Sequence, residues 1–348
     1  MSELPSVMRA AIVEKVGGPA QLKVRERPLP TLDPGEVLIA VHAAGVASWD
    51  VDMREGWTPD GRKPRLPLIL GTDGSGTVAA IGSRVRRFAV GDRVYAFSLA
   101  NAKGGFYAEY VAVPATSVAP IPAGLDMMEA GAMPATSLTA LQGIDDALKL
   151  ERGECAIVHG AAGGVGTLAI QFARLRGARV LATASGEDGL ALVRRLGADA
   201  VVDGKKDDIR DAAFRFAPDG VDAVLAFAGG PALTRCLDAL RRGGRLAYPN
   251  GIEPTPRKRR GIRGVAFDAR RVFVSYSGSI APSRPRIWTC RSIRSIRSPI
   301  SPTRTGGSRR DTCWARSSSA SADRTAFVGE ADRQRRAPIV VGRSLLVD

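Results

Sequence analysis

The most regular hydrophobic pattern in the chain lies between residues 154 and 176. Cys155 to Val158 form an apolar run with the length of a strand that is buried on both faces. A glycine-rich turn, GAAGGVG at 160–166, comes next, and apolar residues then recur at helical spacing as far as Leu175. A strand, a tight turn and a helix in this order are typical of the beginning of a βαβ unit that binds a dinucleotide.

The residues that follow continue the alternation of strand and helix. We expect further strands at 179–184, 200–202, 221–227 and 245–248, with helices at 187–196 and from Pro231 to near 243–244. Strands and helices alternating at this spacing predict the α/β class, with a doubly wound parallel sheet.

Each glycine of the turn has a physical reason. Gly163 allows the backbone to approach a pyrophosphate, and Gly166 allows the helix to pack closely on the strand. The free N–H groups at the start of the helix attract the anion, so Ala162, Gly163, Gly164 and Val165 are expected cofactor contacts. An ordinary tight turn is the alternative, but the strand before it and the helix after it favour the nucleotide site.

The first third of the chain has a different pattern. Segments 8–13 and 22–27 are predicted to pair as strands, and Glu36 to Ala43 alternates polar and apolar residues as a half-buried antiparallel strand does. Short strands and glycine turns continue to residue 124, and a helical pattern at 125–147 leads into the nucleotide unit. We therefore divide the chain into a β-rich domain (1–124), a nucleotide-binding domain (125–268) and a tail (269–348).

Composition excludes several classes of protein. The hydrophobic fraction of 45% is ordinary for a soluble protein, and no apolar run approaches the ~20 residues that span a bilayer. Residues 1–8 contain no apolar core of signal-peptide length. Four scattered cysteines (155, 236, 290, 313) indicate neither a disulfide framework nor a zinc cluster. We expect a cytoplasmic protein without a membrane partner.

The net charge of +15 is concentrated in the tail. Residues 269–348 contain 16 Arg, no Lys and 5 acidic residues, a net charge of +11, which leaves +4 for residues 1–268. The basic run at 255–260 fits a solvated loop better than a nucleic-acid contact. Nucleic acid is therefore not an expected partner of the folded body.

Several further motifs occur in a family's order along residues 8–268. They are Gly45-Val46 with Asp50 and Arg54-Glu55-Gly56, then 70–76, 90–94, 105–110, 133–140 and the 160–166 turn. In this combination the chain resembles the zinc-free branch of the medium-chain dehydrogenase/reductase family, related to quinone oxidoreductases. The resemblance implies a GroES-like β domain and a Rossmann domain, with substrate and nicotinamide meeting between them. Relatives are often dimers, so a homodimer is an expected partner state.

The residue types at the family's metal positions predict that no zinc is bound. Zinc-dependent relatives have Cys where this chain has Ala47, and a His-Glu pair where it has Thr72-Asp73. The chain has only two histidines, His42 and His159, and each fits a packed or cofactor-adjacent residue better than a ligand.

Without a metal, the expected reaction is hydride delivery from NADPH to a small electrophile, a quinone or an α,β-unsaturated carbonyl. Asp50 and Tyr107 are the candidate proton donors, and solvent is the alternative. Asp50 also fits a structural acceptor that holds a loop. A nucleotide-binding sensor or a catalytically impaired paralogue is the second candidate function.

The cofactor preference depends on the end of the second strand. Ala184-Ser185-Gly186 is small and neutral, which leaves room for a 2′-phosphate and favours NADPH over NADH, although Gly189 replaces the Lys of many NADPH-dependent relatives. Ser185 and Asp188 also fit a capping box. The resemblance further implies that Thr139 lies beside the nicotinamide, unless its hydroxyl bonds its own helical turn. The remaining expected cofactor contacts follow the fourth and fifth strands: Ala228, Gly229, Asn250 and Gly251.

The family pattern stops after Ala269. Arg and Ser make up 30 of the next 80 residues, counted from 269, and no helical periodicity is sustained. Three hypotheses remain open: an out-of-frame translation of the family's usual ending, a basic arm for a polyanion, or a divergent folded ending with a strand within Ala337 to Leu346.

Overall fold

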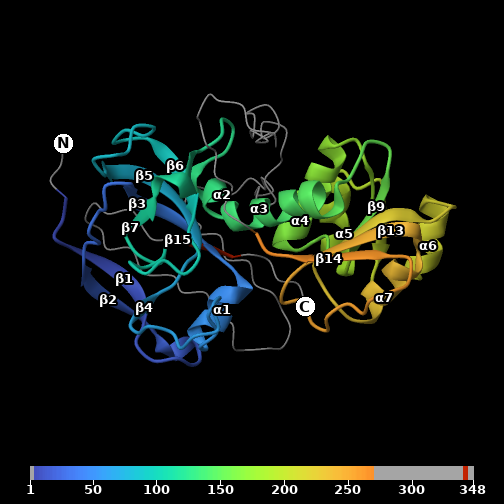
Figure 1. Cartoon of the computed structure of the whole chain (residues 1–348), viewed down its shortest axis with the longest axis horizontal. Coiled ribbons are helices and arrows are strands. Elements are labelled where there is room, and N and C mark those ends of the chain that lie inside the picture. Colours follow the sequence, from blue (N-terminus) through green and yellow to red (C-terminus); the bar gives the residue numbers. More distant parts are fainter. Residues whose placement is uncertain (1–3, 270–339, 344–348) are drawn as a thin grey trace, which may run out of the picture.

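The computed structural model describes residues 4–269 and 340–343, which form two domains side by side (Figure 1). The predicted fold class is confirmed: a β-rich domain comes first and a doubly wound α/β domain follows. Within the described residues, none of the helices combines the length and the apolar character needed to cross a bilayer.

The β domain contains two sheets. The smaller has the order β2-β1-β4 and consists of β1 (Val7–Val13), β2 (Leu22–Pro28) and β4 (Leu68–Ile69). The antiparallel pairing predicted for 8–13 and 22–27 is confirmed. The larger has the order β15-β3-β5-β6-β8, and β7 also pairs with β3. Its strands are β3 (Glu36–Val46), β5 (Asp73–Ile81), β6 (Arg93–Phe97), β7 (Tyr110–Pro114), β8 (Val118–Pro120) and β15 (Val340–Arg343).

Helical structure in this domain is short and lies in the connections. It comprises η1 (Pro19–Gln21), α1 (Ser48–Arg54) and η2 (Ala115–Ser117). The core lies on the larger sheet, because alternate residues of β3 such as Val37, Ile39 and Val41 face inward and are buried.

Three short helical segments connect the domains, where the sequence predicted one helical stretch. They are α2 (Met127–Gly131), α3 (Pro134–Gln142) and the π-helical η3 (Gly143–Leu148). The break between α2 and α3 occurs at Pro134, which has no N–H to continue the first helix but fits the first turn of the second. Figure 1 shows α2 and α3 between the two domains.

The second domain is a sheet of six parallel strands in the order β11-β10-β9-β12-β13-β14. The strands are β9 (Cys155–His159), β10 (Arg179–Ala184), β11 (Ala200–Asp203), β12 (Val221–Ala226), β13 (Leu240–Pro249) and β14 (Arg263–Phe267). The connecting helices are α4 (Gly164–Leu175), α5 (Gly186–Arg195), α6 (Ile209–Phe216) and α7 (Pro231–Asp238). The central strands are buried, as apolar runs in a parallel sheet require.

One predicted boundary in this domain is wrong. The helix beginning at Pro231 ends at Asp238 rather than near 243–244, and β13 already begins at Leu240. The carbonyl of Ala239 accepts the N–H of Val221 at 2.9 Å. From Ala239 onward the backbone therefore pairs with β12 instead of continuing the helix. The sequence pattern also did not predict α6 or the sixth strand, β14.

The end of the chain returns to the β domain. β15 pairs in parallel with β3, from Val340 opposite Ala43 to Arg343 opposite Val46. A strand within Ala337 to Leu346, which belongs to the third hypothesis for the tail, is therefore confirmed for Val340–Arg343. The Arg/Ser-rich stretch at 270–339 lies outside the described residues.

An ion pair between a buried carboxylate and a half-exposed arginine joins the connecting segment to the nucleotide domain, and it gives a stability prediction. Asp145 in η3 accepts hydrogen bonds from Arg176, at 2.7 Å to Nε and 2.5 Å to the terminal nitrogen. The Asp145 side chain is 5% exposed and that of Arg176 43% exposed. We expect Asp145→Ala to lower the free energy of unfolding by about 1–3 kcal/mol, measured by urea titration, because the carboxylate and its packing are lost together.

Arg215→Ala is the matched control. Its pair with Asp211 lies on the surface of α6, with side chains 68% and 62% exposed. We expect a change below about 0.5 kcal/mol there. Equal effects of the two substitutions would contradict a structural role for Asp145.

Candidate active site

The glycine turn lies between β9 and α4, at the carboxyl end of the parallel sheet. A Cβ on Gly166 would lie 2.4 Å from the carbonyl oxygen of Gly160, so only glycine lets the helix pack this closely on the strand. Gly163 is the N-cap of α4 with an ordinary φ of −76°, and a Cβ there would meet only the Gly160 oxygen, at 3.4 Å. The turn therefore has room at Gly163 and none at Gly166.

The expected cofactor residues follow four strands of this one sheet. Ala162 and Gly163 follow β9, Gly164 and Val165 begin α4, Ser185 and Gly186 follow β10, Ala228 and Gly229 follow β12, and Asn250 and Gly251 follow β13. Because the strands are parallel, their carboxyl ends lie along one edge, where open α/β sheets bind ligands.

Contacts between these segments hold the edge together. A Cβ on Gly160 would come within 3.6 Å of Phe227 and Ala228, and one on Gly229 would lie 2.5 Å from the Glu253 carbonyl oxygen. The Asn250 side chain donates from Nδ2 to Asp268 Oδ2 at 2.8 Å. The β12 and β13 loops therefore contribute backbone to this edge, while the Asn250 amide nitrogen is engaged by Asp268.

The end of β10 differs from the expected capping box. Ser185 is the N-cap of α5, but its side chain makes no capping hydrogen bond, so the pairing with Asp188 is wrong. Asp203 at the end of β11 supplies the acceptor instead: Oδ2 accepts the Gly186 N–H at 3.3 Å and Oδ1 the Lys205 N–H at 2.9 Å. These backbone donors hold the pKa of Asp203 below its ordinary value.

His159 is buried beside the turn. Its Nδ1 lies 2.7 Å from Thr183 Oγ1, which also accepts the Gly160 N–H at 3.2 Å. Burial first, and the nearby Arg235 charge second, lower the pKa of His159 to about 4, so the imidazole is neutral at pH 7. His159 is thus a packed residue beside the glycine turn, one of the two expectations for it. His42 is exposed on β3 rather than packed.

Asp50 and Tyr107 are in contact, as candidates for one site should be. Asp50 is 3% exposed and accepts three hydrogen bonds: from Ala47 N–H at 2.8 Å, Gly71 N–H at 3.3 Å and the Tyr107 hydroxyl at 3.2 Å. Burial raises the pKa of Asp50 to about 6, against the opposing effect of its donors. This geometry suits both an acid near neutral pH and a structural acceptor that holds α1 to the 70–71 segment.

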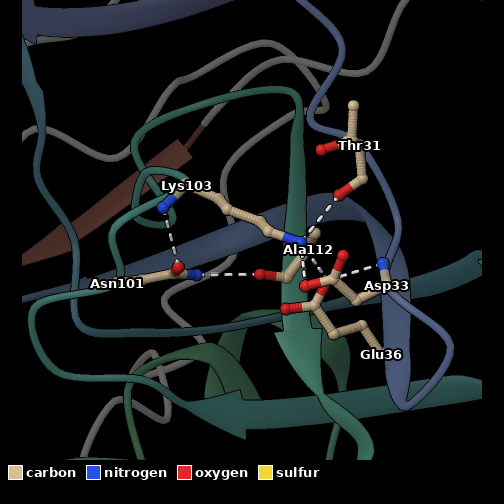
Figure 2. A network of polar contacts seen from close by, with 6 residues as sticks. All are labelled: Thr31, Asp33, Glu36, Asn101, Lys103 and Ala112. Carbon is tan, nitrogen blue, oxygen red and sulfur yellow. Dashed lines mark hydrogen bonds and ion pairs between the residues drawn. The ribbon is translucent and has the colours of Figure 1, made fainter.

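The loop that carries Tyr107 is fixed by an ionic cluster (Figure 2). Lys103 Nζ lies 2.8 Å from Asp33 Oδ2 and 2.6 Å from Glu36 Oε2, and it donates to the Thr31 carbonyl at 3.0 Å. Asn101 adds a bond from Nδ2 to the Ala112 carbonyl at 2.8 Å. Beyond the cluster, the Phe106 N–H donates to the Gly71 carbonyl and the Tyr107 N–H to the Leu70 carbonyl, both at 2.9 Å. The phenol is thereby set against the segment that Asp50 holds.

The positions that bind zinc in relatives have other partners here. Ala47 has no donor atom in its side chain, and Thr72 Oγ1 accepts the Trp49 indole N–H at 3.0 Å. Asp73 is 3% exposed, and its Oδ2 accepts the Ala135 N–H at 2.9 Å. Burial, reinforced by the charge of Asp50, raises the pKa of Asp73 to about 7. In the part of the chain that the structure describes, no three His, Cys, Asp or Glu side chains form a possible metal site.

Thr139 lies on α3, which packs against α4. Its hydroxyl donates to the Ala135 carbonyl at 2.8 Å. The hydroxyl is therefore bonded to its own helical turn, as the alternative to a nicotinamide contact predicts. The helix places Thr139 at the domain junction.

Two buried carboxylates in this region were not predicted as site residues. Asp73 is bonded to the first turn of α3, and Asp203 is bonded to the first turn of α5. Asp203 could have been predicted, because a carboxylate at the end of a buried parallel strand is visible in the sequence. Asp73 could not, because its partner Ala135 is 62 residues away along the chain.

Two family models match the chain. The alcohol dehydrogenase GroES-like domain matches residues 33–123, and the zinc-binding dehydrogenase model matches residues 164–286. The second match extends past Ala269, where the sequence pattern was expected to end.

Curated relatives and solved structures agree with these models. Quinone oxidoreductase of Rattus norvegicus is 33% identical over 81% of this chain and 88% of its own length, and the Homo sapiens protein is 32% identical over 79% and 85%. Among structures, an NAD-dependent alcohol dehydrogenase has a TM-score of 0.69 at 34% identity, covering 75% of this chain and 85% of its own.

Two further structures bear on cofactor and substrate. A mycobacterial protein, Rv1454c, in complex with NADPH has a TM-score of 0.66 at 30% identity (75% and 81% covered). The CurK enoyl reductase has a TM-score of 0.68 at 25% identity (76% and 82% covered). With both domains matched and relatives above 30% identity covered over 85–88% of their length, this chain belongs to the medium-chain dehydrogenase/reductase family.

Proposed function

We propose that this oxidoreductase uses NADPH to reduce a quinone or an α,β-unsaturated carbonyl compound without a metal ion. The observation that carries the proposal is the turn at 160–166, with α4 amides directed from the carboxyl edge of a parallel sheet. The similarity to quinone oxidoreductases and to an enoyl reductase supports both acceptor classes.

The cofactor preference rests on the end of β10. Ala184, Ser185 and Gly186 offer no carboxylate of their own for a ribose 2′-hydroxyl, and the Asp203 carboxylate accepts backbone N–H groups on both oxygens. The NADPH complex of a relative supports the same choice.

Metal-free chemistry rests on the side chains at the zinc positions of relatives. Alanine supplies no ligand at 47, and the Thr72 and Asp73 oxygens accept hydrogen bonds from Trp49 and Ala135. Zinc normally requires three protein ligands drawn from Cys, His and carboxylate. The residues present do not fit it, and an acceptor that is already electrophilic does not require it.

Reduction of the acceptor needs a hydride and a proton. Bound NADPH supplies the hydride. In the structure the Tyr107 hydroxyl donates to Asp50 Oδ2 at 3.2 Å. When Asp50 is neutral this bond reverses: the carboxyl donates its proton to Tyr107 as the phenol gives its own proton to the acceptor oxygen, because burial raises the pKa of Tyr107 and disfavours a free phenolate. Neutral Asp50 is available because burial raises its pKa to about 6.

The first test compares substitutions within the glycine turn. Gly163→Val introduces a side chain at the start of α4, where the proposed diphosphate would meet the amides, and the φ of −76° at 163 is open to L-residues. We expect the Kd for NADPH to rise at least about tenfold, while the loss of a glycine N-cap lowers the unfolding free energy by only about 1 kcal/mol. Gly166→Ala should instead destabilise the fold by about 1–3 kcal/mol.

Fluorescence titration with NADPH and with NADH, alongside urea unfolding, measures both quantities. Gly35→Val, in an exposed loop where a Cβ meets nothing within 4 Å, is the control. An unchanged NADPH affinity in Gly163→Val would remove the basis of the proposal, and tighter binding of NADH would overturn the cofactor preference. Stoichiometric binding with no oxidation by quinones or enals would favour the nucleotide-binding sensor.

The second test is the pH dependence of turnover. Because Asp50 must be protonated to act, kcat/KM with a non-ionising quinone should fall as pH rises through about 6. Asp50→Asn should abolish this fall, and Tyr107→Phe should lower kcat/KM by roughly 10²-fold. Full activity in both variants would show that solvent supplies the proton.

Stability over the same pH range provides a separate readout for Asp50. Its pKa is raised from 3.8 to about 6 in the folded protein, so the folded state binds the proton more tightly than the unfolded chain. The unfolding free energy should therefore decrease as pH rises from about 4 to about 6, and this decrease should be smaller in Asp50→Asn. This decrease is expected whether Asp50 acts as an acid or only as a structural acceptor.

A further inference from the structure

Asp73 joins the two domains at the site but has no part in the proposed reaction. It is the first residue of β5, and its Oδ2 accepts the N–H of Ala135, the second residue of α3, at 2.9 Å. A carboxylate at the N-terminus of a helix is stabilised by the free amides of its first turn. The bond therefore fixes where α3 begins relative to the β domain.

Ala135 passes this constraint on to Thr139. Its N–H donates to Asp73, and its carbonyl accepts the Thr139 hydroxyl at 2.8 Å. The same helix packs against β5 and β6 on the β-domain side and against α4, the helix of the glycine turn, on the other. A displacement of α3 would therefore move Thr139 relative to the residues that hold the cofactor.

The pocket around the carboxylate is fitted to aspartate. A Cβ on Gly45 would lie 2.4 Å from Asp73 Oδ1, so the β3 backbone packs directly against this oxygen. The matched second contact on the same strand is Ser75, whose hydroxyl donates to the Met127 carbonyl at the start of α2. β5 thus holds α2 through Ser75 and α3 through Asp73.

We propose that Asp73 is a positioning residue, which sets the register of α3 between the domains and thereby the position of this helix relative to the bound nicotinamide, while the Thr139 hydroxyl remains bonded to its own turn. The inference rests on the proposed function for the identity of the cofactor, but the contact itself belongs to the protein alone. Misplacing a reacting group by about 1 Å can lower a rate by roughly 10²-fold, so a single hydrogen bond at this junction can control hydride transfer.

Two substitutions at Asp73 separate the bond from the packing. Asp73→Asn keeps the shape and an acceptor oxygen for the Ala135 N–H, whereas Asp73→Val has a similar size without an acceptor. In Asp73→Val we expect amide exchange at Ala135 to accelerate at least about tenfold in the cofactor-free protein. We expect single-turnover oxidation of NADPH by a quinone to slow by roughly 10- to 100-fold, with a larger isotope effect from deuterated NADPH.

Asp73→Asn should stay within about threefold of the wild type in both measurements. Ser75→Ala is the matched control, because it removes a junction contact on the same strand without touching α3, and it should leave the isotope effect unchanged while lowering stability. Hydride transfer in Asp73→Val at the wild-type rate would overturn the proposal.

Failure of the proposed function is distinguishable. If the wild type oxidises no NADPH, the proposed reaction is wrong. Amide hydrogen exchange at Ala135 then tests, without any turnover, whether Asp73 holds the start of α3. Unchanged protection of Ala135 in Asp73→Val would then overturn the assignment of Asp73.

Discussion

Direct packing of backbone against its neighbours determines the geometry on which this protein depends. At Gly166 the first turn of α4 meets the carbonyl of Gly160, and at Gly45 the β3 backbone meets the Asp73 carboxylate. Neither contact tolerates a methyl group. The first sets the position of α4, whose N-terminal amides are proposed to bind a diphosphate, and the second seats the carboxylate that holds α3.

Three buried carboxylates divide the structural work at the site. Asp50 accepts hydrogen bonds at the start of α1, from the 70–71 segment and from Tyr107. Asp73 accepts one from the first turn of α3, and Asp203 one from the first residue of α5. Each accepts backbone N–H groups, which is how a buried acid avoids the full cost of desolvation. Their pKa values differ in direction because burial dominates at Asp50 and Asp73, while backbone donors dominate at Asp203.

Local patterns predicted the parts of the fold that depend on local rules. The run at 155–158, the glycine turn and the apolar spacing of α4 led to the correct βαβ unit, since strand burial and helix periodicity are visible within about twenty residues. The sequence identified Asp50 and Tyr107 as candidate proton donors, and the structure places their side chains within hydrogen-bond distance of each other.

Predictions failed where distant pairing competes with local preference. β13 begins at Leu240 because its backbone pairs with β12, although Gly243-Gly244 resembles a helix stop. Ser185 has the sequence of a capping residue, but the acceptor comes from Asp203, on the neighbouring strand. Asp73 and Ala135 are joined only by the folded arrangement of the two domains. Such contacts have no period or motif that a single sequence displays.

The pairing of β15 with β3 makes the last part of the chain a neighbour of the first catalytic candidate. β3 has β5 along one edge, and its other edge is shared by β7 at 36–40 and β15 at 43–46. Residues 43–46 lead directly into Ala47 and Asp50. Loss of β15 would therefore leave the backbone N–H and C=O groups of residues 43–46 unpaired on this edge, just before the residues that lead to Asp50.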